Sequence, residues 1–265
     1  MAGLIAAAGE SMKGWQTAGL ICAAGEQGEG IQVAGLGSVS GGKFSGIQVA
    51  GLFSVAGEQL KGAQIGGLFS VAGENLKGVQ ISGLFNVAER LTGLQVGLVN
   101  VARDLSGVPV GLVNLTRKED RRIRLAAWAG NASLLNAGAK IWAKRFYSIL
   151  YAGAVNLTQE ARECLAYGFQ YGYGVPVRST VGGSGRKMRI DVDAGYLYLD
   201  NSTLFRHLKG TPDRHVLSLR GAWAVEISPD VSVFAGTGLR YTVDYGTDFG
   251  DGAVSPVFFA GVELF

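Results

Sequence analysis

The feature that most constrains this chain is a short internal repeat. Residues 46–61 read GIQVAGLFSVAGEQLK, and residues 62–77 read GAQIGGLFSVAGENLK. A fixed short period predicts a stacked array in which each unit packs against the next. The steps between units are 16 residues at first and shorten to 15 and then to 14, and the units begin at Gly14, Gly30, Gly46, Gly62, Gly78, Gly93 and Gly107.

Each unit alternates as a β-strand does, because Ile47 and Val49 face one way while Gln48 faces the other. The unit at Gly78 becomes the unit at Gly93 by losing one residue before the internal glycine. A one-residue loss inside a continuous strand would turn every later side chain to the opposite face. A corner between two short strands absorbs the loss, and glycine suits a sharp corner. We therefore predict that each unit is one solenoid coil with two short strands and a glycine bend. A charged tetrapeptide, such as EQLK at residues 58–61, closes the unit.

Stacked coils place equivalent residues above one another, so polar positions are expected to form ladders. One ladder ends where Pro109 takes the next position and consists of Gln16, Gln32, Gln48, Gln64, Gln80 and Gln95. The other consists of Cys22, Ser38, Ser54, Ser70, Asn86, Asn100 and Asn114. Stacked amides can bond from one to the next. Such ladders either lie in the interior, where their side chains hydrogen-bond to one another, or form an exposed face that binds a ligand or ice. We favour the interior ladder. The Asp-rich pattern of calcium-binding coils is absent, so no metal or cofactor is predicted.

From residue 121 the repeat gives way to longer alternating segments. Their apolar faces are rich in Tyr and Trp, as interfacial aromatic girdles are. Most reach the roughly 9–11 residues that a tilted strand needs to cross a bilayer. The expected strands are 122–130, 134–143, 146–156, 161–177, 187–199, 215–228, 231–245 and 254–265. We predict an all-β chain, with a β-solenoid over residues 1–120 and an antiparallel, about eight-stranded membrane β-barrel over residues 121–265. A soluble β-sandwich is the less favoured alternative.

A barrel of about eight strands encloses little more than its own side chains. The charged residues on its polar alternates are therefore expected to pair inside it and to leave no open pore. They are Arg162, Arg189, Asp191, Asp193, Arg220, Glu226, Arg240 and Asp244.

Two stretches carry a family resemblance. The ending GVELF, closed by Phe265, resembles the last strand of Gram-negative outer-membrane barrels, although their usual aromatic residue two positions earlier is here Glu263. The segments GLQVGLVNVA (93–102) and GVPVGLVNLT (107–116) resemble a family of bacterial surface-repeat proteins that includes leptospiral members. Together, the two resemblances imply the bacterial outer membrane as the location and its lipid as a partner.

Composition narrows the remaining possibilities. The net charge of +3 is too small to predict nucleic-acid binding. The two cysteines, Cys22 and Cys164, lie far apart without metal or redox spacing, so two free thiols are expected. The sequence contains no run of about 18 apolar residues, so no membrane-spanning helix is predicted. The opening residues 3–13 align with 51–61, so we expect a signal sequence, with any earlier repeats, to be missing from this sequence.

Chemistry-bearing residues are few. His207 and His215 lie in or beside the polar segment 200–214, near Ser202, Asp200 and Asp213, which is a composition that any polar loop has. The sequence therefore predicts a protein that is not an enzyme, in which a barrel anchors a repeat module with a structural or protein-binding role. The alternatives are a small barrel enzyme acting on lipid or peptide, and a wider pore to which the repeats contribute strands.

The connections between the expected strands predict an orientation. An even number of strands brings both ends of a barrel to one side, and outer-membrane barrels turn tightly on the periplasmic side. The connections 143–145 and 228–230 are short and fall on that side, whereas 200–214 and 246–253 are long. The repeats are therefore expected in the periplasm.

Overall fold

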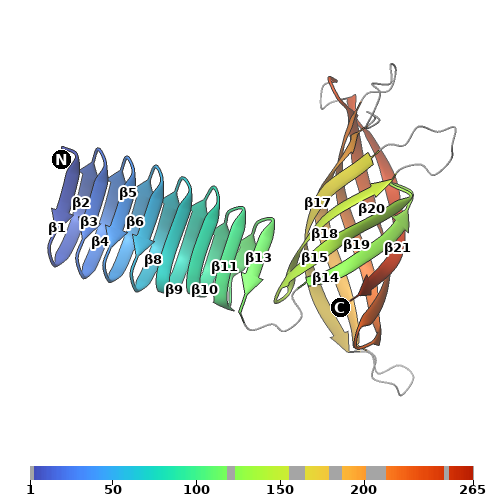
Figure 1. The fold of residues 1–265 in the computed structure, drawn as a ribbon, viewed down its shortest axis with the longest axis horizontal. Coiled ribbons are helices and arrows are strands. Elements are labelled where there is room, and N and C mark those ends of the chain that lie inside the picture. The colour runs from blue at the N-terminus through green and yellow to red at the C-terminus, as the bar shows by residue number, and fades with distance from the viewer. Residues whose placement is uncertain are drawn as a thin grey trace. The chain divides into compact units, whose positions relative to one another are not determined.

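A computed structural model shows the chain as two compact units, Met1–Asp120 and Arg121–Phe265 (Figure 1). The structure describes residues 3–117, 123–154, 165–178, 187–200, 213–247 and 251–264. The fold is all-β, as predicted, with a parallel solenoid-like stack in the first unit and a closed antiparallel barrel in the second. In the part of the chain that the structure describes, no helix is long and apolar enough to cross a membrane.

The first unit is a β-solenoid in which every strand pairs in parallel with its equivalent in the next coil. Like residues pair with like, for example Gln32 with Gln48 and Ser38 with Ser54. The strands are β1 (Ile5–Ala8), β2 (Ser11–Ala18), β3 (Ile21–Ala24), β4 (Gln27–Ala34), β5 (Gly37–Ser40), β6 (Lys43–Ala50), β7 (Phe53–Ala56), β8 (Gln59–Gly66), β9 (Phe69–Ser82), β10 (Phe85–Val96), β11 (Val99–Leu105), β12 (Val108–Val110) and β13 (Val113–Thr116).

Glycines set the corners of each coil. In the coil of β6 and β7, one corner follows Ala50 and a second follows Ala56. A third bend lies inside β6 at Gly46, whose φ of +135° is a conformation that other residues rarely adopt. A Cβ at Gly46 would also lie 1.9 Å from the carbonyl oxygen of Gly30 in the coil before. The solenoid coil with glycine corners is therefore confirmed. The charged tetrapeptide is not a separate closure, however, because residues 59–61 belong to β8, and each coil has three short sides, two of which lie on the longer strand.

The two shortened coils lose their residues at corners. Pairing between β9 and β10 shifts register between Ala88 and Arg90, which is the corner before the charged segment. The second loss leaves only two residues between Val96 and Val99, where the preceding coil has three between Ile81 and Phe85. Strand faces are conserved on both sides of each loss, as the argument from alternation requires.

An apolar column within the charged segment was not anticipated from the sequence. Leu60 lies in the tetrapeptide EQLK yet is fully buried, because its side chain points into the coil between two outward polar neighbours. The column consists of Met12, Phe44, Leu60, Leu76, Leu91 and Leu105. Gly28 holds the remaining position, and the Phe44 ring fills its space, since a Cβ at Gly28 would lie 2.3 Å from that ring.

The second unit is a barrel closed by pairing of its first and last strands. All neighbours are antiparallel, so the predicted strand order is confirmed. Because closure uses only these strands, the repeats contribute none, contrary to the wider-pore alternative. The strands are β14 (Ile123–Gly130), β15 (Leu135–Ala143), β16 (Phe146–Ala154), β17 (Leu165–Arg178), β18 (Lys187–Asp200), β19 (Arg214–Ser228), β20 (Val231–Asp244) and β21 (Ala253–Leu264).

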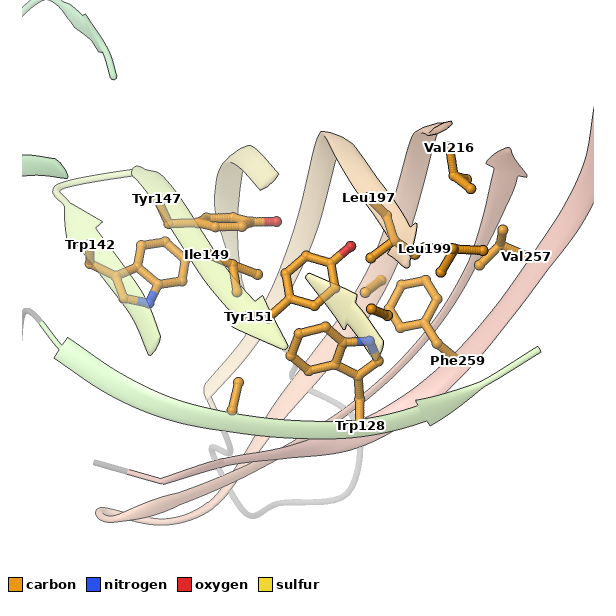
Figure 2. Packing of buried hydrophobic residues seen from close by; sticks show 13 residues of the cluster. Trp128, Trp142, Tyr147, Ile149, Tyr151, Leu197, Leu199, Val216, Val257 and Phe259 are labelled. Atoms are coloured by element: carbon orange, nitrogen blue, oxygen red, sulfur yellow. The ribbon is translucent and has the colours of Figure 1, made fainter. Parts of the chain in front are cut away.

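Large aromatic side chains fill much of the barrel interior. Figure 2 shows Trp128 against Tyr151, and Trp142 against Tyr147, with ring centroids 4.9 Å and 4.7 Å apart. Phe259 of β21 packs in the same cluster. These rings leave room for only a few polar side chains, which are therefore held in close contact with one another.

Candidate functional site

The centre of the barrel's polar interior is Glu263, near the end of β21. Its side chain is 1% exposed and accepts bonds from cations on three other strands. The distances to its carboxylate oxygens are 3.2 Å from Arg124 Nη1, 2.6 Å from Lys140 Nζ and 3.0 Å from Arg189 Nη2. Strand closure explains this convergence, because β14 pairs directly with β21 and places Arg124 next to it.

A second carboxylate, Asp191, completes this cluster. Its Oδ2 lies 2.8 Å from Lys140 Nζ and 2.8 Å from Arg189 Nη2. The cations outnumber the carboxylates, and aromatic faces help to offset the difference. Lys140 Nζ lies 4.0 Å from the centroid of the Tyr147 ring, and the Arg189 guanidinium lies 4.4 Å from that of Trp142.

Arg220 organises a neighbouring group of buried polar side chains. Its Nε and Nη2 donate to the two carboxylate oxygens of Asp193 at 2.8 and 3.2 Å, and Nη2 also donates to Gln170. Tyr147 donates from its hydroxyl to Asp193 at 2.9 Å, which links this group to the ring beneath Lys140. A bidentate arginine–carboxylate pair is the strongest form of such an interaction.

The space left inside the barrel is small. One cavity of about 20 Å³ lies beside Tyr151, Gln170 and Arg220, and another of about 20 Å³ lies between Lys140 and Asp193. Each has room for about one water molecule. The described interior is therefore filled by its own side chains and can hold water rather than a substrate.

Half of the predicted interior charges pair inside the barrel. Arg189, Asp191, Asp193 and Arg220 lie inside and pair as described above. Arg240 lies partly buried and bonds to neutral groups, at 2.8 Å to Ser255 Oγ and 3.1 Å to a backbone carbonyl.

The expectation of interior pairing is wrong for Glu226 and Asp244. Glu226 lies 3.6 Å from the exposed Lys187, and Asp244 pairs with Arg214 while both remain nearly half exposed. Both residues lie at or close to the ends of their strands, where the barrel opens to solvent. Arg162 lies outside the described residues.

Sequence reasoning missed the residues at the centre of this network. Arg124 and Lys140 lie in the first two strands, whose weak alternation gave little signal. Glu263 had a signal, because it replaces the aromatic residue expected near the end of the last strand. That position faces the interior in this barrel, where a carboxylate is needed to balance three cations.

The glutamine ladder runs through the interior of the solenoid. Gln32, Gln48, Gln64, Gln80 and Gln95 are fully buried. Each donates from Nε2 to the Oε1 of the glutamine one coil earlier, at 2.7 to 3.0 Å. Several also donate to a backbone carbonyl across the coil, as Gln64 does to Val71 at 3.2 Å. The ladder thus lies inside the stack and offers no face to a ligand or to ice.

The second ladder changes its bonding where serine gives way to asparagine. Ser54 donates to the carbonyl of Ile65 at 2.9 Å, and Ser38 and Ser70 bond in the same way. Asn86 donates to Asn100 at 2.9 Å and Asn100 to Asn114 at 2.8 Å, the direction opposite to the glutamines. Cys22, at the start of this column, is a free, buried cysteine, and Cys164 lies outside the described residues.

His215 is surrounded by tyrosine side chains. It lies on the outward alternates of β19, and its Nδ1 is 2.6 Å from the Tyr196 hydroxyl. The rings of Tyr196, Tyr198 and Tyr245 surround it at centroid distances of 5.4 to 5.9 Å. His207 and Ser202 lie outside the described residues. Among the described residues, no three His, Cys, Asp or Glu side chains are placed to hold a metal ion.

The outer surface of the barrel is almost free of charge. Along the described strands, the alternates that face outward include one acidic residue, Asp200, at the very end of β18. Aromatic groups gather near both ends of the strands. Towards one end, the ring centroids of Phe146 and Tyr173 are 5.0 Å apart. Towards the other end, those of Tyr167 and Tyr198 are 5.2 Å apart. Comparison of the chain with protein-family models, characterised proteins and solved structures finds no match.

Proposed function

We propose that this is a non-enzymatic protein of the bacterial outer membrane, in which the barrel is a lipid-embedded anchor for the repeat unit. The observation that carries the proposal is the distribution of charge in the barrel. The ion pairs Lys140–Glu263 and Arg220–Asp193 are buried inside, and the outward alternates are apolar with aromatic groups towards both ends. The repeat unit would have a structural or protein-binding role, and we propose no nucleic-acid partner because the net charge is only +3.

Lipid accounts for this arrangement better than water does. Exposed side chains such as Leu219, Trp223 and Leu239 are each more than half exposed, although a soluble barrel would place polar residues there. Closure leaves no unpaired strand edge, which is the condition for β-structure in hydrocarbon. Ionisable residues in membrane proteins face the interior and pair with one another, as Lys140 and Glu263 do.

The orientation of the barrel follows from its turns. Two-residue connections join β15 to β16 and β19 to β20, at the end where β14 begins and β21 finishes. Tight turns mark the periplasmic side of outer-membrane barrels. We infer that the repeat unit, which precedes β14, is periplasmic.

Cysteine labelling tests the anchor. In a background with Cys22→Ser and Cys164→Ser, Leu219→Cys should react with a lipid-phase probe, while the inward neighbour Ser218→Cys should not. Folded protein extracted in detergent should also migrate differently on gels before and after heating. Equal labelling at both positions, or a preference for Ser218→Cys, would contradict the membrane barrel.

Epitope tags test the orientation separately. A tag inserted after Gly42, in the corner between β5 and β6, should be hidden on intact cells. A tag after Thr247, beyond the end of β20, should be bound by antibody. The opposite accessibility would reverse the orientation and leave the anchor itself unaffected.

A further inference from the structure

The outer surface of the repeat unit is apolar on two of its sides. In the coil from Gly46 to Lys61, the outward side chains of these sides are those of Ile47, Val49, Leu52, Phe53 and Val55, with Leu52 at the corner between them. We call the equivalent positions in all coils the apolar surface. Its corner column consists of Leu20, Leu36, Leu52, Leu68, Leu84, Leu98 and Leu112.

The apolar surface continues through the whole stack. Phe53 and Phe69 stack with ring centroids 5.4 Å apart and an angle of 8° between their planes. Although each side chain is partly covered by its neighbours in the column, Leu68 is 43% exposed and Phe85 49% exposed. A contiguous exposed apolar surface of this kind marks an interaction site.

All charged residues from residue 14 to residue 116 lie outside the apolar surface. They lie in the segment between the second corner and the next coil, such as Glu58 and Lys61. The set is Glu26, Glu29, Lys43, Glu58, Lys61, Glu74, Lys77, Glu89, Arg90, Arg103 and Asp104. One side of the solenoid is therefore charged along its length, and the other two sides carry no charge.

The backbone at the leucine corner is hydrogen-bonded from coil to coil. Leu52 and Phe53 both donate to the carbonyl of Leu36, at 2.9 and 3.0 Å. The next coil repeats the pattern, since Leu68 donates to Leu52 at 2.8 Å. A surface can enter hydrocarbon only if its backbone polar groups are satisfied internally, and this corner meets that condition.

We propose that the apolar surface binds lipid, so that the solenoid lies along a membrane with the leucine corner inserted and the charged side in water. The charged side runs the full length of the stack, so an axis across the membrane would draw those charges into hydrocarbon. An axis in the membrane plane avoids this cost, as it does for amphipathic helices. Each side is about four residues wide, or roughly 13 Å, which is enough for the corner to reach the roughly 5–10 Å depth at which such elements lie.

A second copy of the chain fits this surface less well. Its apolar columns lie on two sides that meet at a corner, and pairing with another solenoid would cover one side and leave the other in water. Lipid covers both sides and the corner together. The proposal does not rest on the function proposed for the barrel, because it concerns residues of the repeat unit alone.

Depth-dependent quenching tests the proposal. The full chain, with Cys22→Ser and Cys164→Ser, would be reconstituted in phosphatidylcholine–phosphatidylglycerol vesicles that contain brominated acyl chains. A bimane label at Leu68→Cys should be quenched several-fold more strongly than a label at Glu74→Cys on the charged side of the same coil. A label at Leu219→Cys on the barrel reports separately whether the anchor is inserted.

Charge substitutions provide the matched comparison. With the label moved to Leu36→Cys, the triple change Leu52→Glu, Leu68→Glu and Leu84→Glu should abolish quenching. The same added charge at Gln59→Glu, Asn75→Glu and Thr92→Glu, on the charged side, should leave quenching unchanged.

Three results would overturn the proposal. One is equal, weak quenching at Leu68→Cys and Glu74→Cys while Leu219→Cys is quenched, which would retain the anchor and reject lipid binding by the repeats. Another is concentration-dependent contact between Leu68→Cys labels of different copies without quenching by lipid, which would identify a second copy as the occupant. The third is an equal effect of the two triple substitutions. Quenching at Leu68→Cys without quenching at Leu219→Cys would support this proposal and reject the barrel anchor.

Discussion

The glutamine ladder stops one coil before the stack ends, and extending it should stabilise the repeat unit. Gln95 Oε1 is buried and has no hydrogen-bond partner among the described residues. Pro109 is in register with Gln95 and occupies the position where the ladder would continue. In Pro109→Gln, the new Nε2 should reach Gln95 Oε1 as Gln95 Nε2 reaches Gln80 Oε1, at 2.8 Å.

The magnitude follows from two opposing terms. Leaving a buried acceptor unpaired costs about 1–3 kcal/mol, which the new bond would recover. Losing proline costs about 0.4–1 kcal/mol, because the unfolded chain becomes more flexible. The open acceptor moves to the terminal coil, where we expect water to bind it. The net gain is about 1 kcal/mol, equivalent to a roughly fivefold smaller population of the opened coils.

Amide hydrogen exchange measured on peptides from residues 78–106 would report this change. Pro109→Leu is the matched control, because it also removes proline and restores a backbone N–H but brings no amide to Gln95. We expect slower exchange in Pro109→Gln than in both wild type and Pro109→Leu. Equal protection in the two variants would refute the ladder argument and assign any gain to the backbone.

Other substitutions test the remaining contacts. Glu263→Gln leaves three buried cations facing a single carboxylate, so urea unfolding of the barrel in vesicles should show a loss of about 3 kcal/mol. Glu226→Gln, at the exposed rim, should change it by less than about 1 kcal/mol. Gly28→Ala brings a Cβ against the Phe44 ring and should cost about 1–3 kcal/mol by overpacking, less in a Phe44→Leu background, as a double-mutant cycle would show. Burial raises the pKa of the Cys22 thiol, so alkylation followed by mass spectrometry should be slow in the folded protein and should begin at a higher pH than for a free cysteine. Rapid labelling at neutral pH would contradict that burial.

Most of the fold could be predicted from the periodicity of the sequence. The repeat fixed the stacking of like residues, and the losses between units located the corners, because only a corner tolerates a change of one residue. The alternation of apolar and polar residues likewise located the barrel strands. The buried apolar column that contains Leu60 was not predicted, because Leu60 stands between polar neighbours and is part of the charged tetrapeptide.

The barrel network could be predicted only in part. Alternation assigned Asp191 and Arg220 to the polar face, but it could not tell which charged residues meet buried partners. Glu226 and Glu263 are both in register with Ser232, yet only Glu263 is buried, because the cations of neighbouring strands converge on it. Asp244, the last residue of β20, pairs with the exposed Arg214 instead. The role of Glu263 depends on closure, which brings the first and last strands together and which local sequence does not encode.

The change from serine to asparagine in the second ladder coincides with the shortening of the coils, and this correspondence sets the register of the stack. Asn86 donates to the carbonyl of Val96, and its amide occupies space beside Gly97, where a Cβ would lie 2.5 Å from Nδ2. Ser70 reaches the equivalent carbonyl of Ile81 with a shorter side chain, in a coil that keeps its full corner. The leucine corner column is the same in every coil and by itself would not resist a slip by one repeat. A slipped stack would instead place serine where the shortened corner requires asparagine and would leave buried polar groups unpaired, at about 1–3 kcal/mol each. The polar ladders therefore define which coil packs on which.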